Sequence, residues 1–200
     1  MTNALVVHGG APTAVINASL YGAVEEARAS GRIDHLYASL GGTSGILKKR
    51  FLDLFTVPQE ELDLLPDTPA SAIGTSRDVL EQEDYRQIAR ILQEYEIRYI
   101  FCNGGNGTMD ACGKIYKACC EAGFSISVVG IPKTIDNDLP VTDHAPGFAS
   151  AIQRQVPGGA GKAGPPGTEP QVRRHLDHPG FRVQDHQPLR YAQASHPGLQ

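Results

Sequence analysis

The sequence of 200 residues contains no tryptophan, and aromatic residues make up only 6% of it. It also lacks an apolar run long enough to cross a membrane, and its N-terminus has no signal-peptide pattern. The net charge is -4, so the chain lacks the excess of basic residues on which most binding to nucleic acids and membrane surfaces depends. We therefore expect a cytoplasmic protein that binds neither nucleic acid nor membranes.

Cysteines are also few, and their spacing does not suit a metal site. The chain has four of them, at Cys102, Cys112, Cys119 and Cys120. A structural metal site would need closely paired cysteines or histidine partners, and neither pattern is present. We expect reduced and mostly buried thiols. His8 and His144 have no obvious partners either, so the sequence favours structural roles for both.

Composition divides the chain into two regions. Residues 1–151 hold 12 basic and 19 acidic residues, whereas residues 152–200 hold 6 basic and 3 acidic ones. Half of the 14 prolines and 4 of the 7 histidines lie in this last quarter. Its hydrophobic residues are too sparse to offset the entropy of ordering a chain. We expect one domain over 1–151, and a tail over 152–200 that is either disordered or the product of a reading-frame shift.

Within the first region, apolar runs alternate with amphipathic stretches. The predicted strands span 4–8, 34–40, 98–102 and 125–131. The predicted helices span 17–30, 83–96 and 109–122. Residues 46–72 are mixed and contain three prolines. Uniformly apolar strands that alternate with helices indicate an α/β fold with a doubly wound parallel sheet covered on both faces. Right-handed crossovers then place the carboxyl ends of all strands at one edge, where ligands bind.

Four short motifs fall at this predicted edge. They are GGAPTAVIN at 9–17, GTSR at 74–77, GGNGT at 104–108 and PKTIDND at 132–138. Glycine turns before a helix offer backbone N–H groups and the helix N-terminus to a phosphate. The carboxylates of the last motif can hold a divalent metal and accept a proton. Together the motifs indicate phosphoryl transfer.

In their order and spacing, the four motifs resemble those of the 6-phosphofructokinases, both ATP- and pyrophosphate-dependent, over residues 4–151. The resemblance implies phosphoryl transfer to the 1-hydroxyl of fructose 6-phosphate, with Mg²⁺ as cofactor. It places the following residues around the phosphoryl donor: Gly10, Arg77, Gly104, Gly105, Asn106, Gly107 and Thr108. An alternative assignment is a different kinase of the superfamily that contains the NAD kinases. Those kinases share a turn like GGNGT, but this assignment does not explain the PKTIDND motif.

The same resemblance assigns the chemistry to the last motif. It implies that Asp136 takes the proton from the sugar hydroxyl, that Thr134 positions the sugar and the migrating group, and that Lys133 belongs to the catalytic set. Asp138 and Asn106 would hold Mg²⁺. Family members usually have aspartate at the position of Asn106, so we expect the neutral asparagine to weaken metal binding.

The identity of the donor depends on two positions that disagree. By resemblance, pyrophosphate-dependent members carry an aspartate at the position of Gly107, and the glycine leaves room for a nucleotide. Lys133 is typical of pyrophosphate enzymes, although some ATP-dependent ones also have it. The sequence slightly favours ATP, and pyrophosphate is the alternative donor.

The acceptor half of the family's site has no counterpart in the sequence. Family members hold the sugar phosphate through an MGR-type motif, arginines and a histidine, partly from a neighbouring subunit, and residues 152–200 match none of these. We therefore expect a truncated phosphofructokinase that is inactive alone. The resemblance also implies that intact family members are homo-oligomers. The alternative is a non-catalytic phosphate- or nucleotide-binding module whose basic tail binds another partner.

Overall fold

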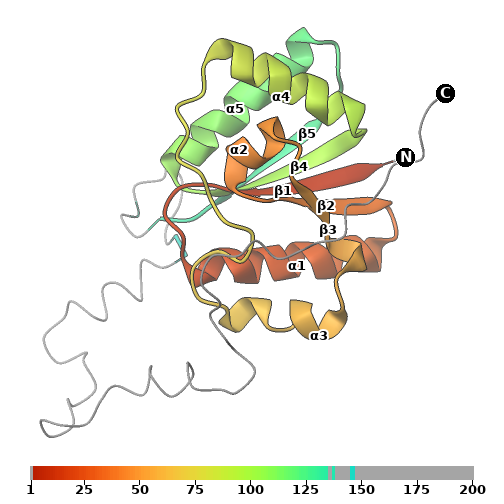
Figure 1. Cartoon of the computed structure of the whole chain (residues 1–200), viewed down its shortest axis with the longest axis vertical. Coiled ribbons are helices and arrows are strands. Elements are labelled where there is room, and N and C mark those ends of the chain that lie inside the picture. Colours follow the sequence, from red (N-terminus) through yellow and green to blue (C-terminus); the bar gives the residue numbers. More distant parts are fainter. Residues whose placement is uncertain (1, 135–136, 138–144, 147–200) are drawn as a thin grey trace, which may run out of the picture. The chain divides into compact units, whose positions relative to one another are not determined.

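The structure of the chain is a computed structural model that describes residues 2–134, 137, 145 and 146. Asp136, Asp138 and His144 lie outside the described residues, and so does the predicted tail over 152–200. The described residues build one sheet between two layers of helices (Figure 1). None of their helices has the length and apolar character that crossing a lipid bilayer requires.

The sheet has five strands in the order β3-β2-β1-β4-β5. The strands span Asn3–His8 (β1), His35–Ser39 (β2), Phe51–Asp53 (β3), Ile97–Gly104 (β4) and Ser127–Pro132 (β5). β2, β1, β4 and β5 are parallel, so their carboxyl ends meet at one edge. The predicted doubly wound parallel sheet is therefore confirmed for four of the five strands.

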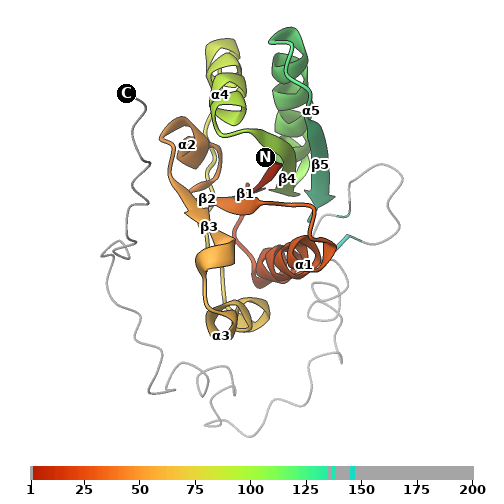
Figure 2. The same cartoon turned by 90° about the vertical axis from the view of Figure 1, so that its right-hand side faces the viewer.

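Helices cover both faces of this sheet. They span Ala14–Ser30 (α1), Gly42–Leu47 (α2), Gln59–Leu62 (α3), Gln82–Glu94 (α4) and Asn106–Glu121 (α5), with 3-10 turns at Leu54–Thr56 and Leu65–Asp67. Figure 2 shows α4 and α5 above the sheet and α1 and α3 below it. α1 ends where Gly31 takes a left-handed conformation (φ 59°), which glycine adopts without strain.

Alternation along β1 divides the apolar core into two clusters. Leu5 and Val7 pack on the side of α4 and α5, whereas Ala4 and Val6 pack on the side of α1. On the first side they meet fully buried residues that include Ile88, Leu92, Ile100 and Ile115. On the second side they meet Leu20, Val24 and Leu36. The spacing of three or four residues within each helix puts these side chains on one face, as the sequence predicts.

Two strands differ from the prediction. β3 pairs with β2 in the antiparallel sense and falls in the mixed segment over 46–72. β5 is the outer strand of the described sheet, and Val129 on it is 42% exposed. The strand predicted over 125–131 is therefore present, but it is not covered on both faces as its apolar sequence predicts. An apolar run in a sequence does not reveal how many strands will flank it.

Candidate functional site

All four predicted motifs meet at the carboxyl edge of the sheet. The backbone N–H of Gly9, at the end of β1, donates to the carbonyl oxygen of Asn103 on β4 at 2.9 Å. The N–H of Lys133, the second residue of PKTIDND, donates to the carbonyl oxygen of Gly104 at 2.9 Å. Gly9 also forms a bridge with Ser76 of the GTSR motif. Backbone hydrogen bonds therefore join the described parts of these motifs directly to one another.

The side chain of Thr108 fills the space between two of the glycines. A Cβ atom on Gly104 would lie 2.6 Å from the carbonyl oxygen of Gly9, and it would also overlap the Thr108 hydroxyl. A Cβ atom on Gly9 would overlap the same hydroxyl. Both positions therefore require glycine because of close packing at the strand ends. Thr108, which the sequence predicts beside the phosphoryl donor, therefore packs with its side chain against both strand ends.

A pocket of about 490 Å³ opens beside these turns. Its walls come from the ends of β1 and β4, the first half of α5 and the segment that carries Arg77. Five residues of the predicted donor set line it: Gly10, Arg77, Gly105, Gly107 and Thr108. Gly104 is buried and Asn106 is exposed, and neither lines the pocket. The structure thus brings most of the predicted donor residues around one cavity.

The N-terminus of α5 lies in the GGNGT turn. α5 begins at Asn106, directly after Gly105, and not at residue 109 as the sequence pattern predicts. The low helix propensity of glycine hides this first turn in the sequence. The first turn contains no acidic residue, and Gly105, the residue before it, has no side chain that could cap it. Because helix N-termini present unpaired N–H groups and partial positive charge, this turn can bind a phosphate through backbone atoms.

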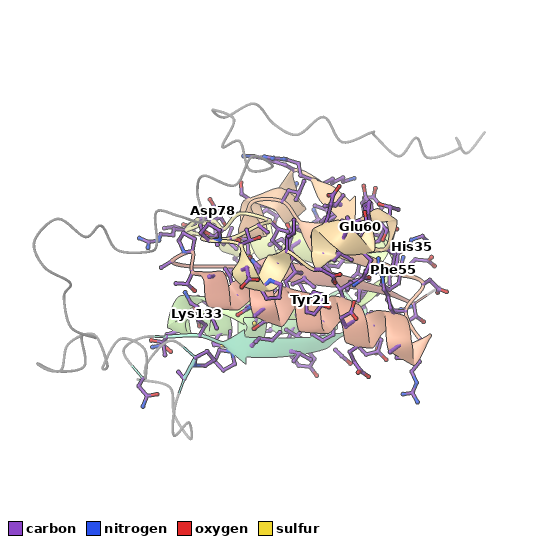
Figure 3. All side chains as sticks on the ribbon, turned by 90° about the horizontal axis from the view of Figure 1, so that it is seen from below. Tyr21, His35, Phe55, Glu60, Asp78 and Lys133 are labelled. Carbon is purple, nitrogen blue, oxygen red and sulfur yellow. The ribbon has the colours of Figure 1, made fainter. Side chains whose placement is uncertain are left out.

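Two cations, Lys133 and Arg77, influence each other at this edge. The Lys133 ammonium donates to the carbonyl oxygen of Ala11 at 2.5 Å, and the residue is only 8% exposed. Burial, and then the positive charge of Arg77, lowers the pKa of Lys133. Figure 3 shows Lys133 at the end of the molecule opposite His35 and Phe55. An anion between the two cations would relieve their repulsion, so the pair favours a phosphate.

The wall of the pocket beside Gly107 is open. Among the described residues beyond its own helix turn, no heavy atom would lie within 4 Å of a Cβ atom at Gly107. Apolar and aromatic residues line the pocket beyond the glycine turns: Val79, Leu80, Tyr85, Ala111 and Ile115. On the same wall, Lys114 pairs with Asp110 at 2.7 Å and lies 5.9 Å from the centre of the Tyr85 ring. The pocket therefore has both a phosphate-binding part and an apolar part.

His8 is a neutral side chain at physiological pH. Burial, followed by the charge of Lys133, lowers its pKa to about 4. Its Nδ1 forms a hydrogen bond with Ser71 Oγ at 2.8 Å. Within the described part of the chain, its Nε2 has no hydrogen-bond partner, and the same holds for Oδ1 of its neighbour Asn103. A histidine that stays unprotonated near pH 7 suits the structural role that the sequence favours.

Asn17 is a positioning residue that the sequence reasoning missed. Its amide donates to the carbonyl oxygens of Thr68 and Ala70 at 2.8 and 3.1 Å, and its Oδ1 accepts from the N–H of Ala72 at 2.9 Å. Asn17 is fully buried in the first turn of α1. It therefore anchors the segment that leads to Arg77. The available signal was a polar residue on the apolar face of a predicted helix.

The predicted catalytic and metal residues are only partly described. Thr134 is 9% exposed next to Lys133 in the chain, whereas Asp136 and Asp138 fall in the stretch that the structure leaves undescribed. Among the residues with described positions, no group of three or more His, Cys, Asp or Glu side chains could hold a metal. The amide oxygen of Asn106 suits Mg²⁺, which prefers oxygen ligands. The metal site therefore stays a prediction.

The family model described as Phosphofructokinase matches residues 3–157 of the chain. Pyrophosphate–fructose 6-phosphate 1-phosphotransferase from Rhodospirillum rubrum is 40% identical over 149 residues, which cover 74% of this chain and 37% of that protein. ATP-dependent 6-phosphofructokinase from Amycolatopsis methanolica is 30% identical over 139 residues, which cover 70% of this chain and 29% of that protein.

A solved structure shares the fold. The crystal structure of pyrophosphate-dependent phosphofructokinase from Marinobacter aquaeolei matches with a TM-score of 0.71 at 34% identity, over 78% of this chain and 40% of that one. The chain thus spans less than half the length of these relatives. Because the family model covers most of its residues and the motifs meet at one edge, the chain belongs to the phosphofructokinase family.

Proposed function

We propose that the described residues form the phosphoryl-donor part of an enzyme that phosphorylates the 1-hydroxyl of fructose 6-phosphate. The observation that carries this proposal is the pocket at the carboxyl edge of the sheet, around which most of the predicted donor residues meet. The N-terminus of α5 and the cationic side chains of Arg77 and Lys133 provide the positive charge that a polyphosphate requires.

The protein's task in this reaction is charge neutralisation and alignment. Asp136 takes the proton from the sugar hydroxyl, and Thr134 positions the migrating group. When bound, Mg²⁺ neutralises charge on the donor oxygens, and Asn106 and Asp138 are the residues that would hold it. The roles of Asp136 and Asp138 come from the family resemblance alone, because both lie outside the described residues.

We propose pyrophosphate as the donor. The Rhodospirillum rubrum protein and the Marinobacter aquaeolei structure carry pyrophosphate in their names, and both are more similar to the chain than the ATP-dependent enzyme from Amycolatopsis methanolica. Lys133 is the residue typical of that class. A compact inorganic donor would need only the phosphate-binding part of the pocket.

ATP is the second candidate because of Gly107. The open space at this position and the apolar wall formed by residues such as Leu80 and Tyr85 can accept a group larger than a diphosphate. Aromatic and aliphatic side chains are common partners of a nucleoside. The two candidates therefore rest on different observations, the relatives for pyrophosphate and the pocket shape for ATP.

Binding and turnover with each donor test these proposals. The full chain is titrated with pyrophosphate and with ATP by calorimetry in the presence of Mg²⁺, and turnover is then measured with fructose 6-phosphate. Tighter binding of pyrophosphate supports the first candidate, and tighter binding of ATP overturns it in favour of the second. Binding of a donor without turnover agrees with a chain that is inactive alone. Binding of neither donor contradicts the assignment of the pocket.

The variant Gly107→Asp tests whether the pocket binds ATP or pyrophosphate. Aspartate fits the open space at Gly107, but its charge and bulk would obstruct a nucleotide that continues past the phosphates. We expect ATP affinity to fall about tenfold or more, and pyrophosphate affinity to fall less. Gly113→Ala is the matched control, since it lies on the same helix outside the pocket lining. Equal losses for both donors would contradict the nucleotide-sized space beside Gly107.

A further inference from the structure

Asn106 and Gly107 form an exposed asparagine–glycine pair in the phosphate-binding turn. The side-chain amide of an asparagine can be attacked by the backbone nitrogen of the residue that follows it. Glycine hinders this attack least, because it has no Cβ atom and its backbone takes up the required conformation readily. The pair therefore has the local sequence that spontaneous deamidation requires.

The same segment contains a second pair of this kind, Asn103–Gly104, which the structure holds in a different way. Asn103 is 1% exposed at the end of β4, and its amide donates to the carbonyl oxygen of Ile16 at 3.2 Å. Gly104 is buried and packs closely against the carbonyl oxygen of Gly9. Attack at this pair would require the amide to leave Ile16 and water to enter the core. The two pairs are alike in sequence, and the fold protects only the first of them along the chain.

The attacking nitrogen of the exposed pair is available. α5 begins at Asn106, so the N–H of Gly107 lies in the first turn, where N–H groups have no intrahelical partner. No carbonyl group among the described residues accepts a hydrogen bond from it. The first turn of a helix frays more easily than its interior, and a glycine weakens it further. The backbone at Gly107 can therefore move its nitrogen toward the side chain of Asn106.

We propose that Asn106 is a site of spontaneous deamidation, with water as the only co-reactant. The nitrogen of Gly107 forms a bond with the amide carbon of Asn106, and the amide nitrogen leaves as ammonia together with the proton of the attacking nitrogen. Water then adds to one of the two carbonyl carbons of the cyclic imide, and the bond from that carbon to nitrogen breaks. Opening at the side-chain carbonyl gives aspartate, and opening at the backbone carbonyl gives isoaspartate. One water is consumed, one ammonia is released, and nothing is oxidised or reduced.

Both products would change the phosphate-binding turn. Aspartate adds a carboxylate at a position that we predict to hold Mg²⁺, so we expect Asn106→Asp to raise the affinity for Mg²⁺ about tenfold. Isoaspartate adds a methylene group to the backbone and displaces the N–H groups of the turn, so we expect donor affinity to fall about tenfold. These two effects rest on the function proposed above, whereas the deamidation itself does not.

Peptide mapping of the full chain tests the modification site. The folded chain is kept in a mildly alkaline buffer, and samples are digested at intervals and analysed by mass spectrometry. We expect the mass gain of an amide that has become a carboxyl group at Asn106, whereas Asn103 keeps its amide. In urea, which unfolds the chain, both pairs should react at similar rates. The unfolded chain thus gives the rate that each pair has without the fold.

Two results would overturn the site. One is an Asn106 that stays unmodified in the folded chain although it reacts in urea. The other is an equal rate at Asn103 and Asn106 in the folded chain. Gly107→Ala adds a methyl group next to the attacking nitrogen and should slow the reaction about tenfold or more. Gly113→Ala, on the same helix, is the control that should leave the rate unchanged.

A last measurement separates the modification site from the donor function. Saturating pyrophosphate with Mg²⁺ should slow the reaction at Asn106, because a phosphate bound to the first turn of α5 holds that turn in place. An unchanged rate in the presence of pyrophosphate and of ATP supports the modification site and contradicts the donor assignment of the pocket. Mapping of the unaltered chain keeps the proposal testable even where a variant fails to fold.

Discussion

The two faces of the sheet differ in chemistry at the edge that carries the pocket. On the side of α4 and α5, the strands end in apolar or thiol side chains such as Val7 and Cys102. On the side of α1, the next residues along the same strands are His8 and Asn103, and both are buried. Side chains alternate along a strand, so one residue separates the dry face from the polar one.

The difference shows how each face supports the site. On the dry face, packing holds α5 and therefore the phosphate-binding turn. On the polar face, hydrogen bonds hold the first turn of α1 and the segment before Arg77: the Asn103 amide donates to the carbonyl oxygen of Ile16 at 3.2 Å, and Asn17 binds the backbone of residues 68–72. The two faces should therefore respond differently to lost volume, lost hydrogen bonds and pH.

The largest expected effect is on the dry face. Ile100→Ala removes a fully buried side chain from the centre of the sheet and leaves a cavity. We expect the free energy of unfolding to fall by about 2–5 kcal/mol, measured by urea denaturation. Val79→Ala, at a position 88% exposed, should change it by less than about 0.5 kcal/mol. Similar losses for both variants would show that this face is not tightly packed.

On the polar face, Asn17→Ala should destabilise the chain somewhat less than Ile100→Ala does. It should, however, also weaken binding of the phosphoryl donor. It leaves two carbonyl groups and one N–H group without their side-chain partner, and we expect a loss of about 2–4 kcal/mol. Donor affinity should fall as well, because the segment that carries Arg77 loses its anchor. Ser19→Ala on the same helix is the control. Unchanged donor affinity in a folded Asn17→Ala chain would contradict the positioning role.

The pH dependence of stability should distinguish the polar face from the dry one. The pKa of His8 is about 4 in the folded chain and 6.5 in the reference state, so the unfolded chain takes up the proton first as the pH falls. The stability that depends on neutral His8 is fully present above pH 6.5, and it is lost as the pH falls toward 4. The full loss is roughly 3 kcal/mol, since one pKa unit corresponds to about 1.4 kcal/mol. Urea denaturation between pH 7 and pH 4 should show a shallower decline for His8→Gln than for the original chain. Equal slopes would remove His8 as the cause.

The smallest expected effect is a gain of stability on α5. In the described part of the chain, the new methyl group of Gly113→Ala would have no heavy atom within 4 Å beyond its own helix turn. Because the change also removes a glycine from the interior of a helix, it should stabilise the chain by about 0.5–1 kcal/mol. Gly104→Ala should do the opposite, because its Cβ would meet the carbonyl oxygen of Gly9, and we expect a loss of about 1–3 kcal/mol. Thermal denaturation of the two variants decides whether their signs differ as expected.

The element order could be predicted from the sequence because apolar runs and glycine turns mark it directly. The apolar runs at 4–8 and 98–102 became β1 and β4, and Gly31 ends α1 as its position indicates. The antiparallel pairing of β3 and the exposure of β5 could not be predicted. Both depend on which strands become neighbours, and local periodicity does not contain that information.

The candidate site shows the same limit. Gly10, Arg77 and Gly107 meet at one pocket because the strands that carry their turns are parallel, which the alternation of strands and helices predicts. The partners of Asn17 at residues 68–72 and the contact of Thr108 with Gly9 lie far away in the chain, so no local pattern identifies these partners. Asp136 and Asp138 stay predictions.

The side chain of Thr108 occupies the space that side chains at Gly9 and Gly104 would need. This limits the substitutions that the family can accept at these positions. A bulkier residue at Thr108 would push both Gly9 and Gly104 away from the helix, and a smaller one would leave space for a methyl group at Gly9. A methyl group at Gly104 would still lie 2.6 Å from the carbonyl oxygen of Gly9, so a change at Thr108 cannot compensate for it. Random mutagenesis that selects for folded chains should therefore recover changes of Gly9 together with changes of Thr108, and it should keep Gly104.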